Sequence, residues 1–216
     1  MIRKFQLLIF VLATSSLSAQ YRQDPNADKI LDAVSARYKK LAGFRASFRR
    51  ESQNNAGGKI NESKGSIVVG GNRYCLKTGN IVLFCDGKTV RTADSKAREI
   101  SVSDYSPDPD DITPERVYTF YQKGYKYIFM GEVKNGSSIW QTIDLEPENL
   151  NKEISKIRLF VDKKSLEIKK WIVYERGSND REEFVVESFQ ALKVDPEKEL
   201  LFNQQAFPGY KTIDLR

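Results

Sequence analysis

From residue 44 onward, the sequence is a series of short strand-like segments separated by turn signals. Phe44 to Phe48 alternates apolar and polar side chains, and Asp86-Gly87 and Asn135-Gly136 are typical of turns. A further turn is expected at Asn54 to Gly58. The pattern predicts about ten to eleven antiparallel strands. They cover residues 44–48, 65–69, 73–77, 81–85, 88–93, 98–102, 125–133, 138–145, 157–162, 166–174 and 182–189.

Several of these segments carry large apolar side chains on both faces, as in the runs from Tyr125 to Met130 and from Trp171 to Tyr174. A sheet with one face in water would alternate more cleanly. The sequence offers only two helices to cover such a sheet. We therefore predict a mainly β (α+β) fold, in which a curved, unclosed half-barrel wraps around apolar side chains and helices cover it.

The first helix is predicted from about residue 25 to 42. Asp24-Pro25 is typical of an N-cap followed by proline at the first helical position, and Gly43 ends the periodic pattern. Its apolar stripe is formed by Ile30, Leu31, Val34, Tyr38 and Leu41. A second, shorter helix is predicted to start at Thr113-Pro114, after a break at residues 106–111. It carries Val117, Phe120 and Tyr121 on one face.

Residues 1–19 have the layout of a secretory signal peptide. Arg3 and Lys4 precede the mostly apolar run from Phe5 to Ala13, and small residues lead up to Ala19, after which cleavage is expected. The apolar run is much shorter than the roughly 20 residues that span a bilayer. We therefore predict an exported protein whose residues 20–216 form a single domain. No cysteine follows Ala19 directly, so the chain is not predicted to be a lipoprotein itself.

The sequence contains no histidine, which excludes Ser-His-Asp and Cys-His nucleophile systems, imidazole-bound zinc and histidine-held haem. Gly87-Lys88-Thr89 resembles the end of a phosphate-binding loop, but Val82 stands where that motif needs glycine, and a strand follows instead of a helix. We predict no catalytic residue, no metal ligand and no cofactor.

Two charged stretches have alternative interpretations. Residues 104–115 hold five carboxylates, whose spacing does not fit an EF-hand, so solvated loop acids are favoured over a calcium site. Asp108 or Asp110 could instead meet a basic partner. Residues 156–176 hold seven lysines or arginines against three acids. A solvated sheet face is favoured there, with docking to an anionic membrane or partner as the alternative, and no nucleic acid is expected.

Cys75 and Cys85 lie in two extended stretches that meet at Gly79-Asn80. If this hairpin pairs symmetrically about residue 80, the two cysteines face each other, and an exported protein lives where disulfides survive. The alternative is that both are small strand residues without a bond.

Five stretches of the chain form a recognisable series. They are DKILDAVSARYKKLAGFRASF, IVLFCDGKT, SDYSPDPDDITPERVYTFYQKGYKY, IDLEPE followed by ISKIRLFVDKKSLEIKKW, and LFNQQAFPGYKTIDLR. In their order and spacing they resemble the periplasmic lipoprotein carriers called LolA, particularly the form found in Bacteroidetes. The resemblance covers about residues 25–216.

This resemblance implies an unclosed antiparallel barrel whose apolar cavity is lidded by helices. It implies a monomeric periplasmic carrier, not an enzyme, that takes outer-membrane lipoproteins from an inner-membrane ABC transporter and passes them to an outer-membrane receptor. The acyl cavity is expected to be lined by Phe44, Phe48, Tyr74, Leu76, Val82 and Phe84. The lid contacts are expected from Ile30, Leu31, Val34, Tyr38, Val117, Phe120 and Tyr121.

Two positions depart from the family pattern. Gly70-Gly71-Asn72 stands where many members have an Arg-Pro pair that latches the lid, which leaves Arg73 as a displaced candidate, and Arg91 stands where a tryptophan is common. The alternative function on the same scaffold is a periplasmic regulator that senses a lipid or lipoprotein and binds an anti-sigma partner. A secreted enzyme is the third alternative.

Overall fold

The computed structural model describes residues 24–54, 58–108, 111–178 and 180–216. The predicted signal peptide, the centre of the turn at residues 54–58 and Asp110 lie outside these ranges. Within them the chain forms twelve strands. These are β1 (Gly43–Gln53), β2 (Lys59–Gly70), β3 (Arg73–Thr78), β4 (Ile81–Cys85), β5 (Thr89–Asp94), β6 (Glu99–Asp104), β7 (Tyr125–Asn135), β8 (Ser138–Pro147), β9 (Ile154–Asp162), β10 (Ile168–Glu175), β11 (Arg181–Leu192) and β12 (Lys211–Asp214).

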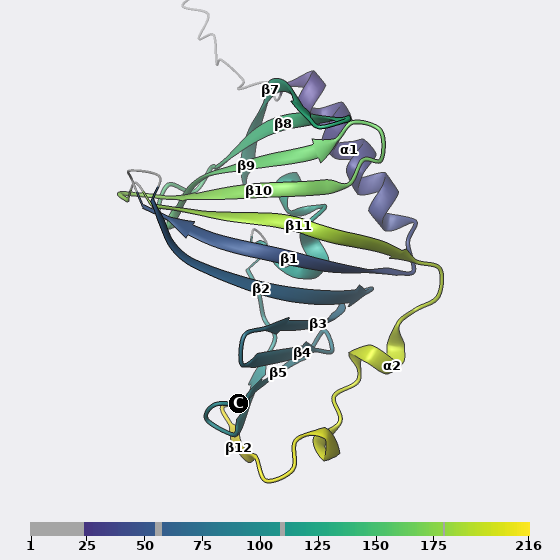
Figure 1. Cartoon of the computed structure of the whole chain (residues 1–216), viewed down its shortest axis with the longest axis vertical. Helices are drawn as coiled ribbons and strands as arrows, with labels where there is room; N and C mark the ends of the chain where they lie inside the picture. Colours follow the sequence, from purple (N-terminus) through teal and green to yellow (C-terminus); the bar gives the residue numbers. More distant parts are fainter. Residues whose placement is uncertain (1–23, 55–57, 109–110, 179) are drawn as a thin grey trace, which may run out of the picture.

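All twelve strands belong to one curved sheet that does not close, in the order β12-β6-β5-β4-β3-β2-β1-β11-β10-β9-β8-β7 (Figure 1). Neighbouring strands are antiparallel except at one edge, where β12 runs parallel to β6. The predicted half-barrel is therefore confirmed. The strand beyond the expected number is β12, which forms in the C-terminal segment by pairing with a strand about a hundred residues earlier.

Helix α1 (Pro25–Lys39) begins as predicted and ends a little earlier than predicted. The carboxylate of Asp24 accepts hydrogen bonds from the backbone N–H groups of Asn26 (2.8 Å) and Ala27 (3.4 Å), which caps the first turn. The other carboxylate oxygen accepts from the N–H of Phe129 on β7 (3.0 Å). One side chain thus starts the helix and fixes its beginning to the sheet. Among the described residues, no helix is both long and apolar enough to cross a membrane.

The second predicted helix is not continuous. Residues 113–122 form two single 3₁₀ turns, η1 (Pro114–Arg116) and η2 (Phe120–Gln122). Thr119, which precedes η2, has φ −137°, which is incompatible with an uninterrupted helix. The segment nevertheless lies on the same face of the sheet as α1, called the inner face below.

The C-terminal segment covers the other face, called the outer face. It contains α2 (Glu197–Leu200) and η3 (Gln204–Ala206) before β12, and in Figure 1 it runs from the end of β11 to the far edge of the sheet. A small second core forms beneath it from Ala93, Ile100 and Val102 together with Phe202, Phe207 and Tyr210. The main core lies on the inner face.

The β3–β4 hairpin is shifted by one residue from the expected register. Its two-residue turn pairs Cys75 with Phe84 and Tyr74 with Cys85. Because alternate residues face opposite sides of a sheet, the cysteines point to opposite faces. Both thiols are free and buried, and burial raises the pKa of each. The expected face-to-face arrangement is therefore wrong, and no disulfide joins these residues.

Candidate functional site

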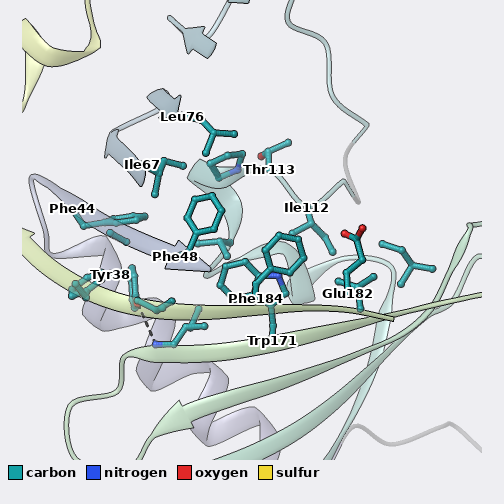
Figure 2. Close-up of a pocket in the computed structure, with 18 residues that line it drawn as sticks. Tyr38, Phe44, Phe48, Ile67, Leu76, Ile112, Thr113, Trp171, Glu182 and Phe184 are labelled. Atoms are coloured by element: carbon teal, nitrogen blue, oxygen red, sulfur yellow. Dashed lines mark hydrogen bonds between the residues drawn. The ribbon is translucent and has the colours of Figure 1, made fainter. Parts of the chain in front are cut away.

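A cavity of about 400 Å³ lies between the inner face of the sheet and its covering segments (Figure 2). This volume falls within the range of roughly 300–1,000 Å³ that holds small ligands. Its lining is almost entirely apolar, and Glu182 is the one fully charged side chain among the described lining residues. The lining residues are Tyr38, Phe44, Ala46, Phe48, Ile67, Leu76, Ile112, Thr113, Pro114, Val117, Ile154, Ile168, Trp171, Val173, Glu182, Phe184, Val186 and Phe189.

Aromatic side chains from β10 and β11 form one wall of this cavity. Trp171 pairs with Phe184, and their rings stack with centroids 5.0 Å apart. The β1–β11 pairing shifts between Ser47 and Phe48, because β11 contains one extra residue there and forms a bulge. The bulge moves the alternation of β11 by one residue, so Phe189 lies on the same wall. The sequence pattern did not single out Trp171, Phe184 or Phe189, since alternation marks two faces without saying which one lines a cavity.

Gly65 on β2 makes room for the ring of Phe48. A Cβ atom at residue 65 would overlap that ring and would lie 2.8 Å from the carbonyl oxygen of Lys77. Glycine at this position therefore lets Phe48 lie across β2 and form part of the cavity floor.

Three of the six residues predicted for the wall line the cavity, namely Phe44, Phe48 and Leu76. Tyr74 shares the inner face with Leu76 but is buried in the main core, where its ring meets Tyr105 edge-on at 6.2 Å. Tyr74 is therefore part of the packing beside the cavity and not of its lining.

The placement of Val82 and Phe84 in the cavity wall is wrong. The β3–β4 register pairs Leu76 with Leu83, so Val82 and Phe84 point to the outer face. There the ring of Phe84 packs edge-on against Phe202 with centroids 5.5 Å apart. Phe84 supports the C-terminal segment, and both side chains line a second hollow between the outer face and that segment. The inward-facing residues of β4 are Ile81, Leu83 and Cys85.

The predicted lid residues on α1 have two different positions. Ile30, Leu31 and Val34 are buried in the main core beneath the helix and do not line the cavity, whereas Tyr38 does. The hydroxyl of Tyr38 accepts a hydrogen bond from the backbone N–H of Ile168 (3.3 Å). Tyr38 thus belongs both to the lid and to the cavity roof.

The second lid segment is similarly divided. Val117 lines the cavity, while Phe120 and Tyr121 are buried behind it. The hydroxyl of Tyr121 donates to the carboxylate of Asp32 on α1 (3.1 Å), which ties the segment to the helix.

A buried carboxylate holds the residues between β6 and η2 in their closed position. Glu115 accepts hydrogen bonds from the hydroxyl groups of Thr113 (2.6 Å) and Tyr105. Arg116 donates to the carbonyl oxygen of Asp108 (3.0 Å). At the other lid element, Arg37 of α1 pairs with Glu167 (2.7 Å) in the turn between β9 and β10.

Arg73 and Arg91, at the two positions that depart from the family pattern, form their side-chain contacts away from the lid. Arg73 pairs with Asp195 (2.6 Å) on the outer face, next to the start of α2. Arg91 pairs with Asp86 (3.1 Å), and its guanidinium carbon lies 5.6 Å from the ring centroid of Phe202. Arg73 is therefore not a displaced lid latch, because it holds the C-terminal segment instead.

Alkaline pH is expected to destabilise the lid. Burial raises the pKa of Tyr38, Tyr105 and Tyr121 to about 12, and the carboxylates of Glu115 and Asp32 act in the same direction on Tyr105 and Tyr121. A raised pKa means that the folded protein favours the neutral phenol. The resulting stability is complete below about pH 10 and is lost as the pH rises through about 12. Melting temperatures measured from pH 8 to 12 should fall above pH 10.

Lysine deprotonation occurs in the same pH interval, so the test needs a control. Tyr121→Phe should have a shallower pH dependence than the unmodified protein, because it removes one of the raised pKa values. An identical pH profile for the variant would contradict the assignment.

Most basic side chains of residues 156–176 are paired, and one acid of the acidic stretch has a basic partner on a distant strand connection. Within residues 156–176, Arg158 forms two hydrogen bonds with Asp144 (2.6 and 2.8 Å), and Lys170 pairs with Glu183 (2.9 Å). In the acidic stretch, Asp111 pairs with Lys152 (3.4 Å). In the part of the chain that the structure describes, no group of three or more carboxylate or thiol side chains could hold a metal ion.

No family model matches the chain, and no curated protein matches it in sequence. Solved structures do match. An uncharacterised conserved protein from Thermus thermophilus gives a TM-score of 0.59 at 9% identity, covering 88% of this chain and 99% of that chain. MucB gives a TM-score of 0.50 at 14% identity, covering 82% of this chain and 63% of that chain. A LolA superfamily protein from Nitrosomonas europaea gives 0.43 at 9% identity, covering 82% and 97%.

At these identities the matches concern the fold alone. The matches with TM-scores of 0.59 and 0.50 share the fold of this chain, which is the unclosed half-barrel that the sequence resemblance implies.

Proposed function

We propose that the protein is a periplasmic carrier that binds the acyl chains of outer-membrane lipoproteins without catalysing a reaction. The observation that carries this proposal is the apolar cavity beneath the lid, whose lining contains one full charge among the described residues. An acyl chain of about 15 methylenes costs on the order of 12 kcal/mol to leave in water, at about 0.8 kcal/mol for each methylene. A shielded passage between two membranes therefore needs a cavity of this kind.

In the proposed cycle, an inner-membrane ABC transporter supplies the lipoprotein and an outer-membrane receptor accepts it. The cavity of about 400 Å³ suits a single chain, so cargo with more chains requires the lid segment around η1 to move away. That movement separates Glu115 from the hydroxyl group of Tyr105, whereas Thr113 moves together with Glu115. It leaves the core contacts of α1 in place.

A second candidate is a regulator that senses an acylated ligand and binds another protein. The structural match to MucB supports this regulator hypothesis, since MucB from Pseudomonas aeruginosa is also solved in complex with MucA. An anti-sigma protein is the partner expected under this alternative. The two proposals share the acyl cavity and differ in what the bound protein does next.

Incubation with inner-membrane spheroplasts distinguishes them. A carrier should release newly made lipoproteins as a soluble one-to-one complex, and native mass spectrometry of the periplasmic protein should detect the mass of an acylated ligand. A regulator should retain a lipid mass but release no lipoprotein. Absence of any acylated mass, with no release, would contradict both functions.

A further inference from the structure

A charged pair marks one end of the cavity. Glu182 lines the cavity, and its carboxylate accepts two hydrogen bonds from the guanidinium of Arg50, one of them from Nε at 3.0 Å. The Arg50 and Glu182 side chains are 42% and 26% exposed, whereas Tyr38 and Phe44 are 5% and 7% exposed. Glu182 and Phe44 lie at opposite ends of the lining in Figure 2. The pair therefore lies where the cavity opens to solvent.

Arg50 continues the inner face of β1 beyond Phe48. It pairs with Phe184 of β11, and its guanidinium carbon lies 6.0 Å from the ring centroid of that residue. A strand rises about 3.3 Å per residue, so Arg50 lies roughly 20 Å along β1 from Phe44. A chain that lies along this wall would place its polar end at Arg50.

We propose that Arg50 binds the anionic head group of the ligand whose acyl chain occupies the cavity. The ligand class is a fatty acid or an anionic lipid, which differs from a lipoprotein because lipoprotein chains are joined through uncharged esters and an amide. The inference therefore rests only on the acyl-binding part of the proposed function. An anion is favoured over a cation because a guanidinium has five N–H donors and Glu182 uses two of them. Arg50 is also the more exposed partner.

An anionic ligand can replace Glu182 as the partner of Arg50 at little cost in free energy. Ion pairs between partly exposed side chains contribute little to stability, because water solvates the separated charges. An incoming carboxylate or phosphate can replace Glu182 at the guanidinium while its chain leaves water. Glu182 then acts as a competitor that lowers the affinity for anionic ligands.

Quenching of Trp171 fluorescence by brominated palmitate and brominated hexadecanol tests this proposal. The two probes have hydrocarbon chains of sixteen carbons and differ in head-group charge. Trp171 is in the cavity wall, whereas Trp140 packs against Phe160 elsewhere. Palmitate should bind about 10-fold more tightly than hexadecanol, as expected for a hydrogen bond to a charged group. Displacement of brominated palmitate by palmitoyl lysophosphatidylglycerol, compared with unlabelled palmitate, distinguishes a lipid phosphate from a free carboxylate.

Matched variants distinguish the contribution of the head group to the affinity from that of the hydrocarbon chain. Arg50→Gln should abolish the preference for palmitate and leave hexadecanol binding unchanged, which also reports an intact cavity. Glu182→Gln should tighten palmitate binding. Arg49→Gln is the control, because Arg49 immediately precedes Arg50 on β1 and its side chain faces the outer face of the sheet.

The outcomes distinguish this inference from the proposed function. Equal affinity of the unmodified protein for both brominated probes, or equal losses in Arg50→Gln and Arg49→Gln, would overturn the role of Arg50 while leaving acyl binding standing. If the unmodified protein bound none of the probes, the acyl-binding function and this inference would fail together.

Discussion

Replacing Leu76 by glutamate is expected to weaken acyl-chain binding at least about 100-fold, because a carboxylate in an apolar lining loses its hydration when a chain enters. Leu76 lies on the cavity floor, next to Ile67 on the neighbouring strand. Trp171 quenching by brominated palmitate measures the affinity, and circular dichroism measures whether the fold survives. The proposed function depends directly on this result.

Substitutions on the adjacent strand provide the control. Val82→Glu and Phe84→Glu place the same charge on the outer face, where the C-terminal segment lies. Both should retain acyl binding, and Phe84→Glu should lower the melting temperature because it disrupts packing with Phe202. Unchanged binding by Leu76→Glu, or equal losses in all three variants, would contradict the assigned cavity wall.

Truncation of Leu31 to alanine is expected to lower the free energy of unfolding by about 3 kcal/mol, within the range for buried leucines. Leu31 is 1% exposed beneath α1, so the substitution leaves a void between the helix and the sheet. Denaturant titration measures the change.

Lys29→Ala on the exposed side of the same helix is the matched control and should change the stability by less than about 0.5 kcal/mol. If Leu31→Ala were as stable as the control, α1 would not be a packed part of the core. A movable α1 would then replace the η1 segment as the lid element that opens.

The local features of the fold follow from short stretches of sequence. Asp24-Pro25 was sufficient to locate the start of α1, because capping and proline geometry act within one turn. Gly79-Asn80 was enough to locate a hairpin, but its register was predicted one residue away from the observed one. A two-residue turn, which hairpins of this kind prefer, pairs Thr78 with Ile81 and would have indicated the correct faces.

The candidate site was less predictable than the fold. Phe44, Phe48 and Leu76 line the cavity as expected, whereas Phe184 and Trp171 come from strands that lie more than ninety residues later in the chain. Their alternation with polar residues is the same whether they fill a core or line a cavity. Only the bulge in β11 and the position of the lid decide which apolar side chains meet a cavity.

The sequence by itself determined the mainly β class, the capped helix and most of the strands, because periodicity, turns and caps depend on neighbouring residues. The tertiary structure alone decided that the C-terminal segment covers the outer face and adds β12 beside β6. It also decided that Arg73 holds that segment and that Glu115 holds the lid. These contacts depend on the space between distant segments, which alternation within a single strand does not specify.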